Sequence, residues 1–329
     1  MSAVGFSWRE TGAPVRVLLH VDGVHDHHTP DLHRMTRTDG VWTTTLELPD
    51  DLVSSYRVIR LDAAAAARFD ATDDSRRRWL DAVTHVVPHR LDHPGWRAPL
   101  SAGASGRLIM ADAPDAPDEP GWVEGDPVDW ERTELDGRTL WTAGLLHAEY
   151  LLVISDGRAW SGTSLPAALA RLGSIGVVAV DTAEDRVALL SRSPAYRDLV
   201  ADQVLPWARQ IADVPAGRTV IAGESLGGLS ALDVVLRRPD AARRAVATSG
   251  SFWAADVAGE IRASGAPDGL RVHLSAGRGE GRGMVGHARD VADALGAAGV
   301  PTSLEIGTHG HEMAAWTGAL TRGLVQVLG

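Results

Sequence analysis

The sequence contains no cysteine and no lysine, and the first absence excludes several chemistries. Without cysteine there is no disulfide, no thiolate metal site and no cysteine nucleophile. All 32 basic residues are arginine, which we attribute to a GC-rich coding bias. Because 43 residues are acidic, the formal net charge is -11, which argues against nucleic acid or an anionic membrane as the main partner.

Two targeting features are also missing from the sequence. The first ten residues contain no basic segment followed by an apolar one, and no apolar run is long enough to span a bilayer. We therefore expect a soluble, cytoplasmic protein. With 329 residues and 44% hydrophobic content, the chain can form two modest domains or one large one.

The first part of the chain has the pattern of short antiparallel strands. Polar and apolar residues alternate in segments separated by turn residues, namely 15–21, 40–48 and 55–60. Such strands can each bury one face by forming two packed sheets, so we predict a β-sandwich over 1–125. A helix followed by a loop is expected over 73–99, and a strand over 107–111. A proline-rich acidic stretch then predicts a domain boundary near Asp126.

Residues 126–329 follow a second pattern, in which apolar segments alternate with amphipathic ones. The predicted strands are 138–143, 150–155, 176–180, 219–222, 244–248, 271–275 and 302–306. The predicted helices include 199–211, 229–237, 285–295 and 314–328. This alternation predicts an α/β hydrolase fold, with a mostly parallel sheet and helices on both of its faces. In such sheets, functional sites form at the carboxyl ends of the strands.

Residues 219–230 read as a strand, a tight turn and a helix, and the turn has the G-x-S-x-G form of a nucleophile elbow. The two glycines of the turn are expected where any larger side chain would collide. Ser225 is therefore the predicted nucleophile. The Leu226 N–H, at the start of the helix, is expected to face a developing oxyanion. The alternative is an ordinary glycine-rich loop between a strand and a helix.

A serine nucleophile needs a base, and the base needs a carboxylate to orient it. In this architecture the order along the chain is serine, acid, histidine. Four histidines follow the serine, and two of them, His309 and His311, lie after the last predicted strand, where the base is expected. The predicted acid is Glu280, in the glycine-rich loop after the preceding strand. Asp256 and Glu312 are weaker alternatives for the acid.

A second oxyanion donor is expected at the end of the strand predicted over 150–155. The residues that follow it, Asp156 to Trp160, form a turn that can present a backbone N–H. Arg158 is the predicted donor.

Taken in order, these features resemble the enterochelin esterases, hydrolases that open the trilactone of ferric catecholate siderophores. The matching segments are 23–28, 41–42, 55–56, 156–160, 223–228, 249–253, 277–280 and 310–316. In the family the histidine precedes an acid and stands five positions before a tryptophan, which selects His311 because of Trp316. The resemblance thus implies a triad of Ser225, His311 and Glu280. It also implies that the N-terminal part forms some of the pocket rim.

The sequence departs from the family at the pair of glycines before the histidine, which is His309-Gly310 here, and in the loop 160–178, which is short. Both departures alter the pocket wall, so the resemblance specifies ester hydrolysis better than it specifies the substrate. A ferric tris-catecholate is an aromatic trianion, which arginine and tryptophan would pair with and stack on. The candidates for substrate binding, besides Arg158, are Trp160, Arg186, Trp253 and Trp316. Core packing is the alternative for each tryptophan.

No cofactor is expected, and iron would enter only as part of the substrate. The run His25-Asp26-His27-His28 is rejected as a metal site, because consecutive residues in a loop rarely converge on one ion. Two other functions remain open at this point. One is a carboxylesterase or peptide-lactone hydrolase of secondary metabolism, and the other is a non-catalytic carbohydrate-binding protein.

Overall fold

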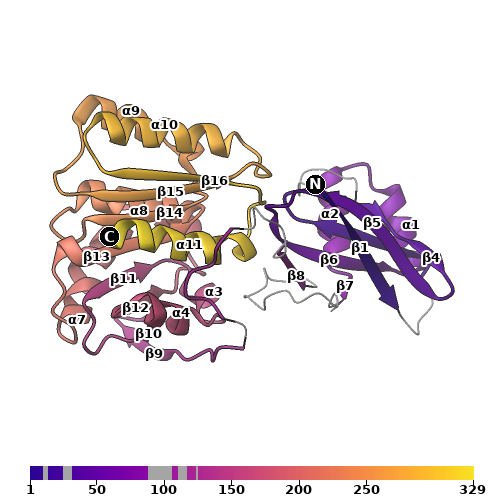
Figure 1. Cartoon of the computed structure of the whole chain (residues 1–329), viewed down its shortest axis with the longest axis horizontal. Helices are drawn as coiled ribbons and strands as arrows, with labels where there is room; N and C mark the ends of the chain where they lie inside the picture. The colour runs from indigo at the N-terminus through magenta and orange to yellow at the C-terminus, as the bar shows by residue number, and fades with distance from the viewer. Residues whose placement is uncertain (10–13, 25–31, 88–105, 110–116, 124) are drawn as a thin grey trace. The chain divides into compact units, whose positions relative to one another are not determined.

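A computed structural model of the chain (Figure 1) describes residues 1–9, 14–24, 32–87, 106–109, 117–123 and 125–329. Its contacts divide the chain into two compact units. The first unit contains Met1–Pro117 together with two later segments, Gly277–Gly281 and Gly307–Ala315. The second unit contains Asp118–Ala276, Arg282–Ile306 and Trp316–Gly329. The first unit is therefore not built from N-terminal residues alone.

The first unit contains two antiparallel sheets. One has the order β1-β5-β4, and the other has the order β3-β2-β6-β7, with β8 also paired to β6. Their strands are β1 (Ser2–Arg9), β2 (Arg16–Val21), β3 (His33–Arg34), β4 (Thr36–Thr38), β5 (Val41–Leu48), β6 (Val53–Leu61), β7 (Val86–Val87) and β8 (Gly106–Ile109). The strands predicted over 15–21, 40–48 and 55–60 are confirmed. The strand predicted over 107–111 is confirmed over 107–109, and its last two positions lie outside the described residues.

The two sheets share one hydrophobic core. Phe6 on β1 and Tyr56 on β6 are both buried, and their rings meet edge to face with centroids 5.6 Å apart. The same core includes Trp42 from one sheet and Leu19 and Val58 from the other. Alternation of side chains along each strand brings these residues to one face.

Two helices, α1 (Ala63–Ala71) and α2 (Ser75–Val83), follow β6. The helix predicted after position 73 is confirmed as α2, whereas α1 was not predicted. Asp62 caps α1 by accepting a hydrogen bond from the N–H of Ala65 at 2.8 Å, and an alanine-rich run continues the helix. Ala65 and Ala66 pack with Leu18, Ile59 and other residues in a second small core.

The second unit is built on an eight-stranded sheet in the order β16-β15-β14-β13-β11-β12-β10-β9. Its strands are β9 (Glu131–Leu135), β10 (Arg138–Ala143), β11 (Tyr150–Ile154), β12 (Ile175–Val180), β13 (Thr219–Glu224), β14 (Arg244–Thr248), β15 (Arg271–Gly277) and β16 (Thr302–Gly307). Strands β12, β11, β13, β14 and β15 pair in parallel, and β10 and β9 are antiparallel at one edge. The seven predicted strands are confirmed, and β9 is an additional one.

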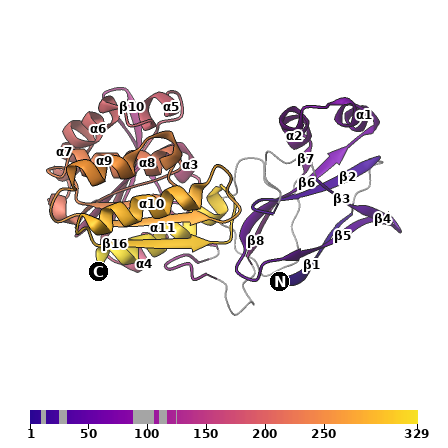
Figure 2. The ribbon, with the colours of Figure 1, turned by 90° about the horizontal axis from the view of Figure 1, so that it is seen from above.

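Helices cover both faces of this sheet. In Figures 1 and 2, α4 and α11 lie on one face and α8 lies on the other. The helices are α3 (Gly157–Trp160), α4 (Leu165–Leu172), α5 (Arg186–Leu190), α6 (Pro194–Asp198), α7 (Leu205–Arg209), α8 (Leu226–Arg237), α9 (Val257–Ser264), α10 (Met284–Ala297) and α11 (Met313–Leu328). A π-helical stretch, Leu199–Val204, precedes α7, so the helix predicted over 199–211 is not uniformly α-helical.

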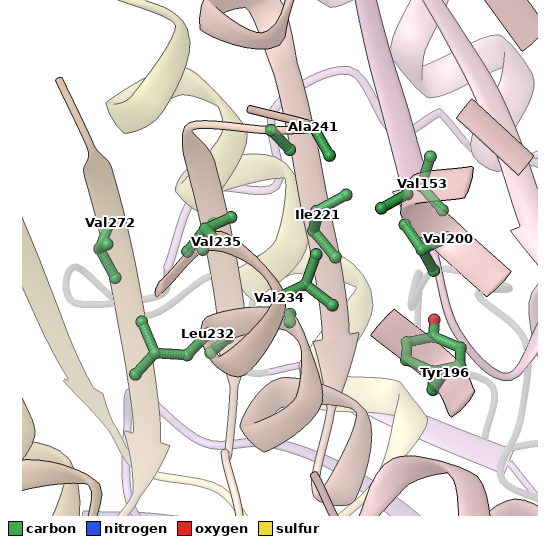
Figure 3. Close-up of a cluster of buried hydrophobic side chains, with 14 of the residues drawn as sticks. Val153, Tyr196, Val200, Ile221, Leu232, Val234, Val235, Ala241 and Val272 are labelled. Carbon is green, nitrogen blue, oxygen red and sulfur yellow. The ribbon is translucent and has the colours of Figure 1, made fainter. Parts of the chain in front are cut away.

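The core of the second unit lies between the sheet and the helices. Figure 3 shows Val153 on β11, Ile221 on β13 and Val272 on β15 beside side chains of α8 such as Leu232 and Val234. Burying one such side chain contributes about 1.5–3 kcal/mol. The continuous apolar strands therefore fix the frame from which the turn at the end of β13 projects. None of the helices in the described ranges combines the length and apolar composition that a membrane span requires.

Candidate active site

Ser225 forms the turn between β13 and α8. Its backbone has φ 58° and ψ -120°, a conformation that L-residues rarely adopt. Two hydrogen bonds hold this turn: the N–H of Ser225 donates to the carbonyl of Thr248 at 3.0 Å, and its own carbonyl accepts from the N–H of Ser251 at 2.9 Å. The strained conformation is thus fixed by the last residue of the neighbouring strand, β14, and by a residue that follows this strand.

The glycines on either side of Ser225 are required by close backbone approach. A Cβ at Gly223 would lie 2.5 Å from the backbone of Gly227 and 2.7 Å from the hydroxyl of Ser155. A Cβ at Gly227 would overlap the same hydroxyl. The predicted need for glycine is confirmed, and Ser155, which the sequence did not single out, is the side chain that imposes it.

The two predicted oxyanion donors both lie in the first turn of a helix. Leu226 is the first residue of α8 and Arg158 is the second residue of α3. Backbone N–H groups at these positions have no acceptor within the helix. The Arg158 side chain pairs with Asp181 at 3.0 Å and is 63% exposed, so its backbone is what suits it to the predicted role. Gly157 allows the close packing of this turn, because a Cβ there would lie 2.6 Å from the carbonyl oxygen of Ala179.

A second hydroxyl lies beside the predicted nucleophile. Ser251 Oγ is 3.2 Å from Ser225 Oγ, and Ser251 is buried. This contact can orient the Ser225 hydroxyl. In the sequence, Ser251 was noted only as part of the matching segment 249–253. It follows β14, the strand that pairs with β13, and this position was a signal that could have identified it.

Two buried carboxyl groups lie close together in the second unit. Glu224, the residue before Ser225, and Asp156 share a side-chain hydrogen bond, and burial together with the charge of Asp156 raises the pKa of Glu224 well above its usual value. Trp160 donates its indole N–H to Glu224 at 3.2 Å. The raised pKa favours the neutral form of Glu224, and its hydrogen bond with Asp156 joins the elbow to the turn that carries Arg158.

This carboxyl pair changes the interpretation of Trp160 and Arg186. Trp160 is fully buried, so its ring offers no surface to a ligand, contrary to the prediction. Arg186 donates from Nε and Nη2 to Asp156 at 2.7 and 2.8 Å. Its Nη2 also donates to the carbonyl of Glu224 at 3.5 Å. Since these hydrogen bonds are all directed to groups of the protein, this geometry gives no support to Arg186 as a substrate-binding cation. Its role here is to neutralise a buried carboxylate.

Of the remaining tryptophan candidates, Trp316 is buried and Trp253 is open. Trp316 donates its indole N–H to Ser249 Oγ at 2.8 Å and is 8% exposed, which argues against stacking on a ligand. Trp253 is 41% exposed, and the Arg282 guanidinium lies 4.5 Å from its ring centroid. This pair presents an aromatic face and a positive charge together. Sequence reasoning missed Arg282, although it lies in the loop just after the predicted acid.

The predicted acid and base lie together in the first unit. Glu280 Oε1 is 3.7 Å from His311 Nδ1 and 3.6 Å from His309 Nδ1, and the Glu280 side chain is almost completely buried. His309 is also buried, and its Nδ1 lies 2.8 Å from the carbonyl oxygen of Gly310. The His311 side chain is 30% exposed. Of the two histidines, His311 is therefore the one whose ring is open to a reactant.

The two alternative acids are used elsewhere in the fold. Glu312 accepts a hydrogen bond from the N–H of Ser55 at 2.7 Å and another from the Ser55 hydroxyl. Burial and the neighbouring Asp22 raise the pKa of Glu312 to about 7. Asp256 caps α9 by accepting from the N–H of Gly259 at 2.9 Å. These contacts favour Glu280 as the partner of His311.

Within the described ranges, no group of three or more histidine, aspartate or glutamate side chains could hold a metal ion. The run from His25 to His28 lies outside the described residues, so its rejection as a metal site stays a prediction.

The fold and the elbow define an α/β-hydrolase of the esterase class. Residues 173–327 match the family described as "Putative esterase", and residues 3–122 match the enterochelin esterase N-terminal family. The iron(III) enterobactin esterase of Escherichia coli O6:H1 is 30% identical over 292 residues, spanning 77% of this chain and 71% of that protein. The corresponding protein of Escherichia coli K12 is 28% identical, spanning 99% and 91%.

A structural comparison agrees. The crystal structure of an enterobactin esterase from Shigella flexneri, determined in the presence of enterobactin, matches with a TM-score of 0.80 at 24% sequence identity, covering 99% of this chain and 92% of that one. The chain belongs to the enterobactin esterase family.

Proposed function

We propose that this protein is a serine esterase that hydrolyses the lactone esters of a ferric catecholate siderophore, enterobactin or a related trilactone. The observation that carries the proposal is the strained Ser225 elbow in a member of the enterobactin esterase family. The substrate class is supported by the relatives, which are named for iron(III) enterobactin. Hydrolysis would open the ring of esters and release the iron.

In the proposed mechanism, Ser225 Oγ attacks the ester carbonyl carbon while His311 accepts the hydroxyl proton. Glu280 orients the imidazole, and the N–H groups of Leu226 and Arg158 stabilise the oxyanion. Collapse of the intermediate breaks the bond to the leaving alkoxide, which takes the proton from His311. Water, deprotonated by His311, then attacks the acyl-serine carbonyl carbon. Collapse of this second intermediate breaks the bond to Ser225 Oγ, which takes the proton back from His311 and releases the acid. The exposure of His311 and the burial of His309 support this assignment.

The substrate would need both charge pairing and stacking. A ferric tris-catecholate carries three negative charges, whereas the protein has a net charge of -11, so local cations must oppose this repulsion. We infer that Trp253 and Arg282 form part of the binding surface, because together they expose a ring and a guanidinium. No cofactor is part of the proposal, and iron is substrate only.

We infer that the two sheets of the first unit form a β-sandwich, because they share a single core. The cytoplasmic location expected from the sequence stays a prediction. Membership of an esterase family leaves the carbohydrate-binding alternative without support. The carboxylesterase alternative is distinguished from siderophore hydrolysis by the product analysis described next.

The proposed function is tested by product analysis with iron-loaded trilactone, iron-free trilactone and a small aryl ester, followed by liquid chromatography and mass spectrometry. We expect the trilactone to be opened to linear catecholoyl-serine esters and finally to monomers, and Ser225→Ala to abolish this. Turnover of the aryl ester with no opening of either trilactone would instead identify a general carboxylesterase.

A further inference from the structure

The segment that carries His311 is attached to the N-terminal strands before the histidine. The N–H of Val53, at the start of β6, donates to the carbonyl of Thr308 at 3.3 Å, and the Thr308 hydroxyl donates to Asp51 at 2.6 Å. Leu52 and Thr308 also form a parallel bridge. The chain therefore enters the segment 307–315 paired with the residues that lead into β6.

The same segment is attached again directly after the histidine. Glu312 accepts hydrogen bonds from both the N–H and the hydroxyl of Ser55, and both residues are buried. His311 thus lies between two attachments, Thr308 and Glu312, that both reach the stretch 51–55. Two attachments so close to one residue restrict the backbone on both sides of it.

The acid loop joins the same cluster. The N–H of Gly279 donates to the carbonyl of His309 at 3.1 Å, and a Cβ at Gly279 would lie 2.5 Å from the carbonyl oxygen of Gly23. A Cβ at Gly310 would lie 2.5 Å from the N–H of Gly23. The turn after β2, the acid loop and the histidine segment are therefore packed backbone against backbone.

The buried position of Glu312 is unfavourable for a carboxyl group. Burying a carboxyl group is unfavourable, and Glu312 lies near Asp22, whose partner Arg57 is 3.5 Å away. His20 faces the same arginine at 3.3 Å. A buried polar group of this kind can contribute by fixing the local conformation of the chain. Here the geometry fixed is that of the residue adjacent to the proposed base.

We propose that Glu312 is a positioning residue for catalysis, and that the N-terminal strands serve the chemical step by holding the His311 segment through Ser55 and Asp51. This inference rests on the proposed function, since it gives His311 the role of base. It assigns to the N-terminal strands a role beyond forming the pocket rim. A rim acts on substrates according to their size, whereas a positioning contact acts on every substrate.

The test compares Glu312→Ala with Glu312→Gln in the full-length enzyme, using a small aryl ester and the ferric trilactone. Glutamine can still accept from the N–H of Ser55, whereas alanine cannot. We expect Glu312→Ala to lower kcat on both substrates by about 10- to 100-fold with KM changed less than about threefold, because a displaced base slows the chemistry. Glu312→Gln should stay within about threefold of the parent.

Asp62→Ala is the matched control, because it removes a carboxylate from the same unit, where that carboxylate caps α1 by accepting from the N–H of Ala65. Its kcat should remain within about twofold of the parent once circular dichroism confirms folding. If Glu312→Ala does not fold, Ser55→Ala, which removes only the hydroxyl bond, should show a smaller loss of kcat on both substrates.

Full activity of folded Glu312→Ala would overturn the proposal, and so would a loss confined to the KM of the trilactone. An intermediate case is also decisive: equal losses in the alanine and glutamine variants would show that the carboxylate itself, not its attachment to Ser55, is needed. The aryl ester keeps this test separate from the proposed function. If the parent enzyme cleaves the aryl ester and not the trilactone, the substrate assignment fails while the comparison of Glu312 variants still stands.

Discussion

The predicted nucleophile and the predicted base are held in place in different ways. Ser225 belongs to the second unit, and its geometry follows from a strand, a turn and a helix that are consecutive in the chain. His311 belongs to the first unit, and its segment is fixed by Asp51 and Ser55, which lie more than 250 positions earlier. Local sequence is thus enough to specify the elbow, whereas the base depends on contacts that only the folded chain creates.

The largest loss of activity is expected from a substitution at the elbow. Ser225→Ala should lower turnover of the ferric trilactone and of an aryl ester by about 10⁵-fold or more, because no other group replaces the nucleophile. The folded structure should be preserved, since the hydroxyl contributes little packing. The measurement is kcat/KM on both substrates, with circular dichroism and thermal unfolding as controls. Near-normal turnover by the purified variant would contradict the mechanism.

Substitutions of the two histidines near Glu280 should have clearly different effects on activity. His311→Ala should lower kcat by about 10⁴-fold or more, whereas His309→Ala should lose far less activity and more stability, because His309 is buried. Steady-state kinetics and thermal unfolding of the two variants measure both effects. A larger loss of kcat in His309→Ala would show that the wrong histidine has been chosen.

At the acid, Glu280→Gln should cost less than loss of either Ser225 or His311. The amide can still orient the imidazole in part but cannot stabilise its positive charge, so a loss of about 10²- to 10³-fold in kcat is expected. The rate on an aryl ester over pH 5 to 9 is the measurement. An unchanged rate would place the acid elsewhere.

Substrate binding provides a smaller and more selective effect. Trp253→Ala and Arg282→Gln should each raise KM for the ferric trilactone by about 5- to 30-fold, which corresponds to about 1–2 kcal/mol for a cation–π or charge contact. Neither should alter turnover of a small aryl ester. Trp316→Phe, which changes a buried residue in the same unit, is the control for general disturbance. Equal effects on both esters would remove this pair from the binding surface.

The effect with the least expected influence on activity concerns the dependence of stability on pH. Because the pKa of Glu312 is raised from 4.5 to about 7, the folded state binds this proton more tightly than the unfolded state. The contribution of Glu312 to the free energy of unfolding is therefore fully present below about pH 4.5, and it is lost as the pH rises through about 7. Glu312→Gln should gain stability relative to the parent between pH 5 and pH 8, by at most roughly 3 kcal/mol. Urea unfolding at the two pH values measures this, and a constant difference would refute it.

Much of the fold could be predicted because its signals are local. Continuous apolar runs such as 219–222 and 244–248 predicted parallel strands, and the alternating pattern of 40–48 predicted β5. Strand β9 was missed because its sequence, Glu131–Leu135, is mostly polar and exposed at the edge of the sheet. Helix α1 was missed because a run of alanines carries almost no periodic pattern.

The candidate site was harder to predict away from the elbow. Trp160 and Trp316 could have been ligand platforms or core residues, and only the partners Glu224 and Ser249 decide between these roles. The attachment of Glu312 to Ser55 leaves no sequence signal, because it joins residues 257 positions apart. Long-range contacts of this kind follow from the packing of several elements and not from any one segment.

The central claim, that Ser225 is the nucleophile acting on a siderophore lactone, is tested most directly by trapping the acyl-enzyme. The enzyme is mixed with ferric trilactone, quenched in acid within milliseconds to seconds and digested for peptide mass spectrometry. The account predicts an added mass equal to the opened trilactone or its fragments on the peptide that contains Ser225, and no such mass in Ser225→Ala. Complete hydrolysis with no adduct on Ser225, or an adduct that persists in Ser225→Ala, would contradict it.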